Sequence, residues 1–437
     1  MRRFPSRRAA MLATLLTATL LVGTGGVASA DPPFVESEAR SIHVLTGDAD
    51  GDYFGWVAAN IGDITGDGVE DLLVPAIADG SFAGKATVYS GATGVELAEH
   101  VGGPGELFGY SAAAAGDVDG DGTGDYVVAA PGASTNPAPF GRVVVFSGAD
   151  HEELLEIEAV DTAFFGSGVS GAGDADGDGH ADILVGASLA SGAGPASGWA
   201  GVYSGDGGSL LWEMDGRHPG DLAGAGVGLV GDVDEDGTDD VVVAASGNGG
   251  EAYLLSGGDG DLIHRFRGRS GAGQAYGTFF ASGAGDIDAD GTPDVFVGDY
   301  LAGRGATVGT GAAYVYSGRT GRPLHVLRGE EVGGGYGPGR GVGDVNGDGH
   351  DDLIIAAYTS SIGAPTAGRA YVVSGADGST LRTITSTVVG DNFGVDALAL
   401  GDVDGDGLTD FVVTSVGLSF FGLAPGTTYV IAGTPLD

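Results

Sequence analysis

Residues 117–125 read DVDGDGTGD, and this nine-residue stretch decides the fold because it recurs along the whole chain. Seven related nonapeptides start 54–58 residues apart, at Asp63, Asp117, Asp174, Asp232, Asp286, Asp344 and Asp402. Every copy has Asp at positions 1, 5 and 9 and Gly at position 6. Self-similarity at so even a period indicates a repeat fold.

Each nonapeptide lies in the same sequence context. An aromatic-Gly pair such as Phe108-Gly109 precedes it, and a β-rich apolar run such as 126–128 follows. A second run then ends in Ser-Gly, as at 147–148, before a more polar fourth segment. Four short strands per unit predict an all-β, seven-bladed β-propeller with four-stranded antiparallel blades. A linear β-solenoid is the structural alternative, but its repeats are shorter and uniform.

The two ends of the chain predict how the ring closes. The last unit ends after its third predicted strand, residues 429–432. Residues 40–47, RSIHVLTG, match the fourth strand of unit five, residues 322–329, RPLHVLRG. We therefore expect the N-terminal strand to complete the last blade, which removes open sheet edges.

Composition excludes several classes of protein. The 437 residues include 60 acidic and 18 basic side chains, a net charge of −42, which excludes an electrostatic nucleic-acid binder and argues against an anionic membrane surface as partner. The chain has no Cys, so disulfides, zinc–thiolate sites and cysteine nucleophiles are excluded. Its hydrophobic content of 42% is sufficient for a packed core.

The first thirty residues predict a signal peptide. Four Arg precede an apolar run from Ala9 to Val22, and small residues follow at 28–30. The run is too short to span a bilayer. We therefore expect a cleaved signal at 1–30, a mature chain at 31–437, and a secreted, extracellular protein without a membrane span. General and twin-arginine export both remain open.

The acidic nonapeptides have the pattern of an oxygen-ligand metal loop. Asp also occupies position 3, except for Thr65 and Asn346, whereas position 7 varies, so we expect its backbone carbonyl to matter and His180 and His350 to be solvated. Carboxylates without soft ligands select a hard cation, and we predict up to seven Ca²⁺ ions, one per blade. The predicted ligands are Asp63, Thr65, Asp67, Val69, Asp71, Asp117, Asp119, Asp121, Thr123, Asp125, Asp174, Asp176, Asp178, His180, Asp182, Asp232, Asp234, Asp236, Thr238, Asp240, Asp286, Asp288, Asp290, Thr292, Asp294, Asp344, Asn346, Asp348, His350, Asp352, Asp402, Asp404, Asp406, Leu408 and Asp410.

Two alternative interpretations of these loops are a solvated turn and an EF-hand. Asp and Gly also form ordinary solvated turns, but seven copies at fixed spacing favour the metal loop. An EF-hand requires Glu at position 12 and flanking helices, whereas Val74 and Val128 occupy that position within predicted strands. Two unit charges about 4 Å apart repel by roughly 4 kcal/mol at an effective dielectric near 20. Closing such a loop therefore requires a cation or proton uptake.

Together these motifs resemble the FG-GAP repeat of integrin α-chain heads, over essentially all of the mature chain. The resemblance implies a seven-bladed propeller with calcium in the loops between strands 1 and 2, on its lower face. It also implies that the opposite face, formed by the 2–3 and 4–1 connections, contacts ligands. Integrin α-chains load calcium in only some blades, whereas every blade here has a loop.

The resemblance leaves several functions open, because similar repeats occur in secreted lectins, a phospholipase and polysaccharide lyases. The first hypothesis is an adhesion or ligand-binding module for an extracellular protein or glycan. Its candidate anchors are Trp199, Tyr300, Arg304, Tyr358, Phe420 and Phe421. The alternative for Trp199 and the Phe420-Phe421 pair is that they pack between blades. The second is a glycan-active or lipid-active enzyme, and the third is an envelope-associated scaffold. No catalytic motif appears, so we expect no enzyme; the ligand and the oligomeric state remain open.

Overall fold

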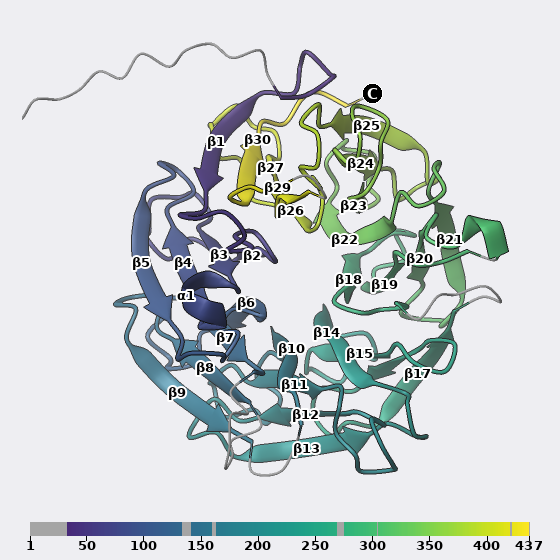
Figure 1. Ribbon diagram of the computed structural model, residues 1–437. Coiled ribbons are helices and arrows are strands. Elements are labelled where there is room, and N and C mark those ends of the chain that lie inside the picture. Colours follow the sequence, from purple (N-terminus) through teal and green to yellow (C-terminus); the bar gives the residue numbers. More distant parts are fainter. Residues whose placement is uncertain are drawn as a thin grey trace, which may run out of the picture. The chain divides into compact units, whose positions relative to one another are not determined.

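The seven repeats fold into seven blades around a common axis (Figure 1). The computed structural model describes residues 33–132, 141–159, 163–268, 275–303, 305–419 and 422–436, and the signal peptide predicted at 1–30 lies outside them. Each blade is a four-stranded antiparallel sheet whose strands follow chain order from the axis outward, apart from the last blade. The predicted seven-bladed, nearly all-β architecture is confirmed.

The strands are short, two to nine residues each. Blades 1 to 3 comprise β2 (Ala59–Asn60), β3 (Leu72–Ala76), β4 (Lys85–Tyr89) and β5 (Glu96–Val101); β6 (Ser111–Gly116), β7 (Asp125–Ala130), β8 (Arg142–Phe146) and β9 (Glu153–Glu158); and β10 (Phe165–Gly171), β11 (Ile183–Ala187), β12 (Trp199–Tyr203) and β13 (Leu210–Asp215). Blades 4 and 5 comprise β14 (Ala223–Gly231), β15 (Asp240–Ala245), β16 (Glu251–Leu255) and β17 (Leu262–Arg267); and β18 (Ala281–Gly285), β19 (Asp294–Asp299), β20 (Ala312–Tyr316) and β21 (Pro323–Arg328). Blades 6 and 7 comprise β22 (Tyr336–Gly343), β23 (Asp352–Ala357), β24 (Arg369–Val373) and β25 (Thr380–Thr385); and β26 (Ala397–Ala399), β27 (Phe411–Ser415), β30 (Thr427–Ile431) and β1 (Ser41–Thr46).

The hydrophobic core is divided among the blade interfaces. Seven apolar clusters lie one between each pair of adjacent blades. Between blades 2 and 3, for example, Val127 and Val145 pack with Ile183 and Val185, all fully buried. Both faces of the second and third strands are covered in this way, which explains their continuous β-branched runs.

The ring closes as expected through its last blade. β1 pairs antiparallel with β30, with Ser41 opposite Ile431 and Thr46 opposite Thr427. In Figure 1 the purple N-terminal strand lies beside the yellow C-terminal one. The prediction that the N-terminal strand completes the last blade is confirmed.

A recurrent hydrogen bond links neighbouring blades at their outer strands. Five blades carry an N–H donor at the same register of the fourth strand, 2.6–3.3 Å from a backbone carbonyl of the next blade. That carbonyl lies in the 3–4 turn of blades 1, 4, 5 and 6 and directly after β30 in blade 7. The donors are His43, Trp212, His264, His325 and Arg382. Four of the accepting residues, Gly91, Gly257, Gly375 and Ala432, are buried, so the bond supplies a partner for a buried carbonyl.

The connections contain three small elements that the repeat pattern did not predict. A single turn, α1 (Asp79–Phe82), and a 3₁₀ turn, η1 (Gly305–Thr307), lie in 2–3 connections, and β28 (Leu418–Ser419) pairs with β29 (Gly422–Leu423). Among the described residues, no helix is long and apolar enough to cross a membrane.

Candidate functional site

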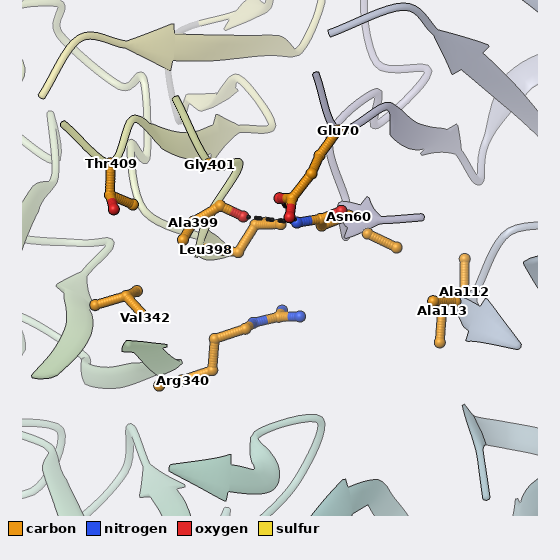
Figure 2. Close-up of a pocket in the computed structure, with 13 residues that line it drawn as sticks. Asn60, Glu70, Ala112, Ala113, Arg340, Val342, Leu398, Ala399, Gly401 and Thr409 are labelled. Atoms are coloured by element: carbon orange, nitrogen blue, oxygen red, sulfur yellow. Dashed lines mark hydrogen bonds between the residues drawn. The ribbon is translucent and has the colours of Figure 1, made fainter. Parts of the chain in front are cut away.

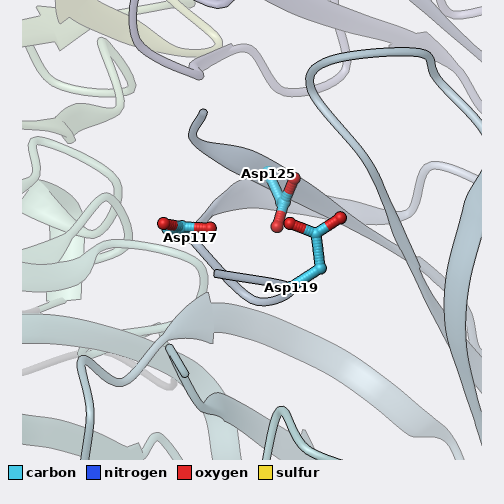
Figure 3. Close-up of side chains that lie close together, drawn as sticks. All are labelled: Asp117, Asp119 and Asp125. Carbon is cyan, nitrogen blue, oxygen red and sulfur yellow. The ribbon is translucent and has the colours of Figure 1, made fainter. Parts of the chain in front are cut away.

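Each acidic nonapeptide forms the loop between the first and second strand of its blade. In five loops, one oxygen from each of three carboxylates lies within 4.8 Å of the others. Figure 3 shows this arrangement for Asp117, Asp119 and Asp125 in blade 2. The other triads are Asp174, Asp176 and Asp182; Asp232, Asp234 and Asp240; Asp286, Asp288 and Asp290; and Asp402, Asp404 and Asp410. Loops 1 and 6 carry Thr65 and Asn346 at position 3, so each lacks the third carboxylate there.

The position-9 aspartate is buried and accepts hydrogen bonds from two connections of its blade; we call it the clip residue. In blade 2, Asp125 is fully buried; its Oδ2 accepts the Val118 N–H at 2.7 Å and its Oδ1 accepts the Gly148 N–H of the 3–4 turn at 2.9 Å. The same pair of bonds recurs in all seven blades at 2.6–3.2 Å, on Asp71, Asp125, Asp182, Asp240, Asp294, Asp352 and Asp410. This residue therefore ties the acidic loop to the outer half of the blade.

Positions 1, 5 and 6 shape the rest of the loop. The position-1 carboxylate accepts the position-6 N–H in every loop at 2.8–3.1 Å, and the position-5 carboxylate accepts the position-7 N–H at 2.7–3.0 Å. The position-6 glycines all have φ between 87° and 95°, and a Cβ there would meet no atom within 4 Å. Gly is thus required by backbone conformation and not by space.

The donor set fits a hard divalent cation. Its side chains present only oxygens, and Oδ1 of Asp117 and Oδ1 of Asp288 are buried without a hydrogen-bond partner among the described residues. A buried carboxylate oxygen without a partner is unfavourable, and a cation would satisfy it. In blade 5, however, Arg319 Nε pairs with Asp290 Oδ2 at 2.8 Å, and in blade 7 Arg40 pairs with Asp404. An ion in those two loops would compete with an arginine.

Burial changes the acidity of the clip residues. It raises the pKa of Asp182 and Asp240 to about 6 and that of Asp294 to about 7, and it raises the pKa of Asp71, Asp125, Asp352 and Asp410 as well. Without a bound cation, folding therefore favours the protonated form of these acids.

We expect the metal-free protein to lose stability as pH rises from about 4 to 7. A raised folded-state pKa contributes stability that is fully present below the unfolded pKa and is lost as pH rises through the folded pKa. Burial lowers the pKa of His100 to about 4 and also lowers that of His151. These two groups act in the opposite direction, but the seven clip carboxyls outnumber them. Thermal melts of protein dialysed into metal-free buffer should give a higher melting temperature at pH 5 than at pH 8. Equal values at the two pH values would contradict this.

A pocket lies on the propeller axis between the innermost strands. It has a volume of about 400 Å³ and is lined mainly by small residues, as expected where seven strands converge. Glu70 and the β22 residue Arg340 are the charged residues of this lining, and Figure 2 shows the Arg340 side chain extending into the pocket. Its Nη2 lies 2.5 Å from Oδ1 of Asp396, a nearly fully buried residue whose Oδ2 accepts the Ala58 N–H. The pair thus links blades 6, 7 and 1 where the ring closes.

An aromatic pocket of about 190 Å³ lies farther along the axis, away from the acidic loops. Its lining includes Trp56 and Val57, which precede the first strand of blade 1, whereas the acidic loop follows that strand. The remaining lining residues are Phe279, Phe280, Tyr300, Pro338, Tyr358 and Val395. Trp56 meets Phe279 edge-on with ring centroids 5.7 Å apart, and Tyr300 meets Tyr358 at 6.0 Å. Blades 1, 5 and 6 therefore contribute aromatic side chains to one pocket, and blade 7 contributes Val395.

The predicted surface anchors have different outcomes. Tyr300 and Tyr358 line the aromatic pocket. Trp199 is buried between blades 2 and 3, where its Nε1 donates to Glu213 at 2.8 Å, so the packing alternative is correct for this residue. Arg304, Phe420 and Phe421 lie outside the described residues. The prediction missed Trp56 and Phe279, although both closely follow the aromatic-Gly position of their units.

The structure corrects the expectation for the two position-7 histidines. His180 and His350 are half-buried, and each ring bonds to the preceding blade instead of being solvated. Their side chains therefore have a role that the variability of position 7 concealed.

Comparisons with known proteins agree with the repeat pattern. The FG-GAP-like repeat model matches residues 232–297 and 344–413, and the FG-GAP repeat model matches 108–146. Integrin alpha-5 of Xenopus laevis is 30% identical over 172 residues, 35% of this chain and 16% of that protein. Integrin alpha-IIb of Homo sapiens is 32% identical over 180 residues, 35% of this chain and 16% of that protein. The aligned regions thus span less than a fifth of these relatives.

One solved structure, titled Structure of Dos1 propeller, has a TM-score of 0.47 and 10% identity, covering 82% of this chain and 74% of that chain, a similarity too low to support an inference. The repeats and the observed blades together define the class of protein. The chain is an FG-GAP repeat protein with an integrin-α-like β-propeller.

Proposed function

We propose that this protein is a secreted, calcium-binding β-propeller that acts as an adhesion or ligand-binding module for an extracellular protein or glycan. The observation that carries the proposal is the aromatic pocket at the end of the axis away from the acidic loops. Aromatic side chains provide large contact areas at binding sites and stack on sugar rings. The integrin-α-like propeller supports the same class of function.

Calcium has a structural role in this proposal. The loops would hold the ions through side-chain oxygens of positions 1, 3, 5 and 9 and through the position-7 backbone carbonyl. Position 3 supplies a hydroxyl oxygen from Thr65 in loop 1, an amide oxygen from Asn346 in loop 6 and a carboxylate in the other loops. The bound ions would neutralise the like charges of each loop. Residues 1–30 would direct export, so intact-mass measurement of the secreted protein should place its N-terminus near Asp31.

Replacing the pocket tyrosines is expected to weaken ligand binding. Tyr300→Ala and Tyr358→Ala each remove an aromatic face from the pocket, and truncation of such an anchor costs about 2 kcal/mol, roughly thirtyfold in affinity. A glycan array and a pull-down from extracellular extracts with the calcium-loaded protein would identify the ligand. Binding measurements would then compare the variants.

Phe82→Ala provides the matched control. Phe82 is 54% exposed in a 2–3 connection of blade 1 and is not among the residues that line the pocket. Its replacement should change affinity less than twofold. Equal losses for Phe82→Ala and the two tyrosine variants would show that the pocket is not the binding site.

A further inference from the structure

Two acidic loops reach across to the loop of the preceding blade through a histidine. His180 is position 7 of loop 3, and its Nδ1–H donates to the carbonyl of Val118 in loop 2 at 2.7 Å. His350 is position 7 of loop 6, and its Nδ1–H donates to the carbonyl of Ile287 in loop 5 at 2.8 Å. Val118 and Ile287 both occupy position 2, so the same bridge has formed twice in the ring.

A second hydrogen bond accompanies each bridge. The N–H of Ala181 donates to the carbonyl of Asp117 at 2.9 Å, and the N–H of Asp351 donates to the carbonyl of Asp286 at 3.1 Å. Asp351 also accepts the Asp286 N–H on its Oδ2 at 2.7 Å. Two adjacent residues of one loop thus bond to the first two residues of the loop before it, which fixes the relative position of the two loops.

The other five loops have no comparable bridge. Their position-7 residues are Val69, Thr123, Thr238, Thr292 and Leu408. Valine and leucine have no donor, and the Thr238 hydroxyl bonds to Asp236 of its own loop. Within the described loops, the two-bond bridge is therefore restricted to the pairs 2–3 and 5–6.

Loops 2 and 5, whose carbonyls accept the histidine hydrogen bonds, have another feature in common. The two buried carboxylate oxygens without partners, Oδ1 of Asp117 and Oδ1 of Asp288, belong to loops 2 and 5. The bridging side chain comes from the following loop, whose own position-7 carbonyl is a predicted metal ligand. His180 therefore contributes its backbone carbonyl to loop 3 and its side chain to loop 2. His350 does the same for loops 6 and 5.

We infer that loops 2 and 3, and loops 5 and 6, take up calcium as coupled pairs, with His180 and His350 as the coupling residues. This inference rests on the proposed calcium function. An ion that fixes the backbone of residue 180 also fixes the imidazole that positions Val118, so loop 2 binds its own ion more tightly. Reciprocity requires the same factor in the other direction.

Calcium binding in emptied-loop variants tests the coupling. Asp178→Ala removes the position-5 carboxylate of loop 3, and Asp236→Ala does the same in loop 4, which has no bridge. Calcium chloride titrations and ion counts after dialysis at subsaturating calcium should show a larger loss for Asp178→Ala. We expect a roughly two- to tenfold weaker affinity of loop 2, the range of one or two hydrogen bonds.

The excess loss should disappear when Asp178→Ala is introduced into the His180→Ala protein and loop 2 is compared with that of His180→Ala alone. It should return with His180→Asn, because the asparagine amide places an N–H donor near the position of Nδ1. Equal losses for Asp178→Ala and Asp236→Ala, or an excess that persists with His180→Ala, would overturn the coupling while leaving calcium binding intact. A wild-type protein that binds no calcium would overturn the proposed function and the coupling with it.

Discussion

Removing calcium is expected to lower the melting temperature of this protein by roughly 10–20 °C. Each occupied site contributes about 1.4 kcal/mol at ten times its Kd by mass action, so seven independent sites would contribute roughly 10 kcal/mol. The physical reason is that three or four carboxylates in one loop repel each other when no cation is present. Thermal melts of the purified protein with and without chelator measure the effect.

Magnesium provides the control for this experiment. The loops offer many oxygens in a flexible arrangement, which suits calcium, whereas magnesium requires close octahedral geometry and retains its waters. Calcium should therefore restore most of the lost stability at neutral pH, and magnesium little of it. A melting curve that chelation leaves unchanged would rule out structural metal in all seven loops.

The second large effect is expected from Asp125→Ala, which removes the clip of blade 2. The substitution leaves the N–H groups of Val118 and Gly148 without their acceptor in a fully buried place. One to three kcal/mol is typical for each such buried group, so we expect a destabilisation of about 3 kcal/mol even without calcium. Chemical denaturation in the presence of chelator measures it.

Asp121→Ala is the control that distinguishes loss of the Asp125 hydrogen bonds from loss of metal binding. Asp121 occupies position 5 of the same loop, is exposed, and accepts only N–H groups of its own loop. Its replacement should remove one ion in the presence of calcium but cost less than about 1 kcal/mol in chelator. If both variants were equally unstable in chelator, the hydrogen bonds of Asp125 would not be the cause.

The sequence predicts the fold well because the unit repeats. Seven equal periods define seven blades, and the match between residues 40–47 and 322–329 is sufficient to assign β1 to the last blade. The acidic loops are equally visible, because their chemistry is contained in nine consecutive residues.

Features assembled from several blades were not predicted, because no local pattern encodes them. The clip depends on the packing of Asp125 against Gly148, although the recurrent Ser-Gly turn was a signal that could have revealed it. The aromatic pocket takes Trp56 and Phe279 from blades far apart in the chain. Arg340 projects into the axial pocket, and its partner Asp396 lies 56 residues further along the chain, so no local pattern reveals the pair.

The shared last blade has a consequence for how the chain reaches its native state. β1 is the first strand of the propeller to be synthesised, whereas its partner β30 is the last. Pairing β1 with β30 closes a chain segment that contains nearly all of the other strands. The entropy cost of closing it is offset only after the six intervening sheets have stacked. Assembly should therefore be slow and finish in one late step, with Ser41–Thr46 exposed as an unpaired edge until then.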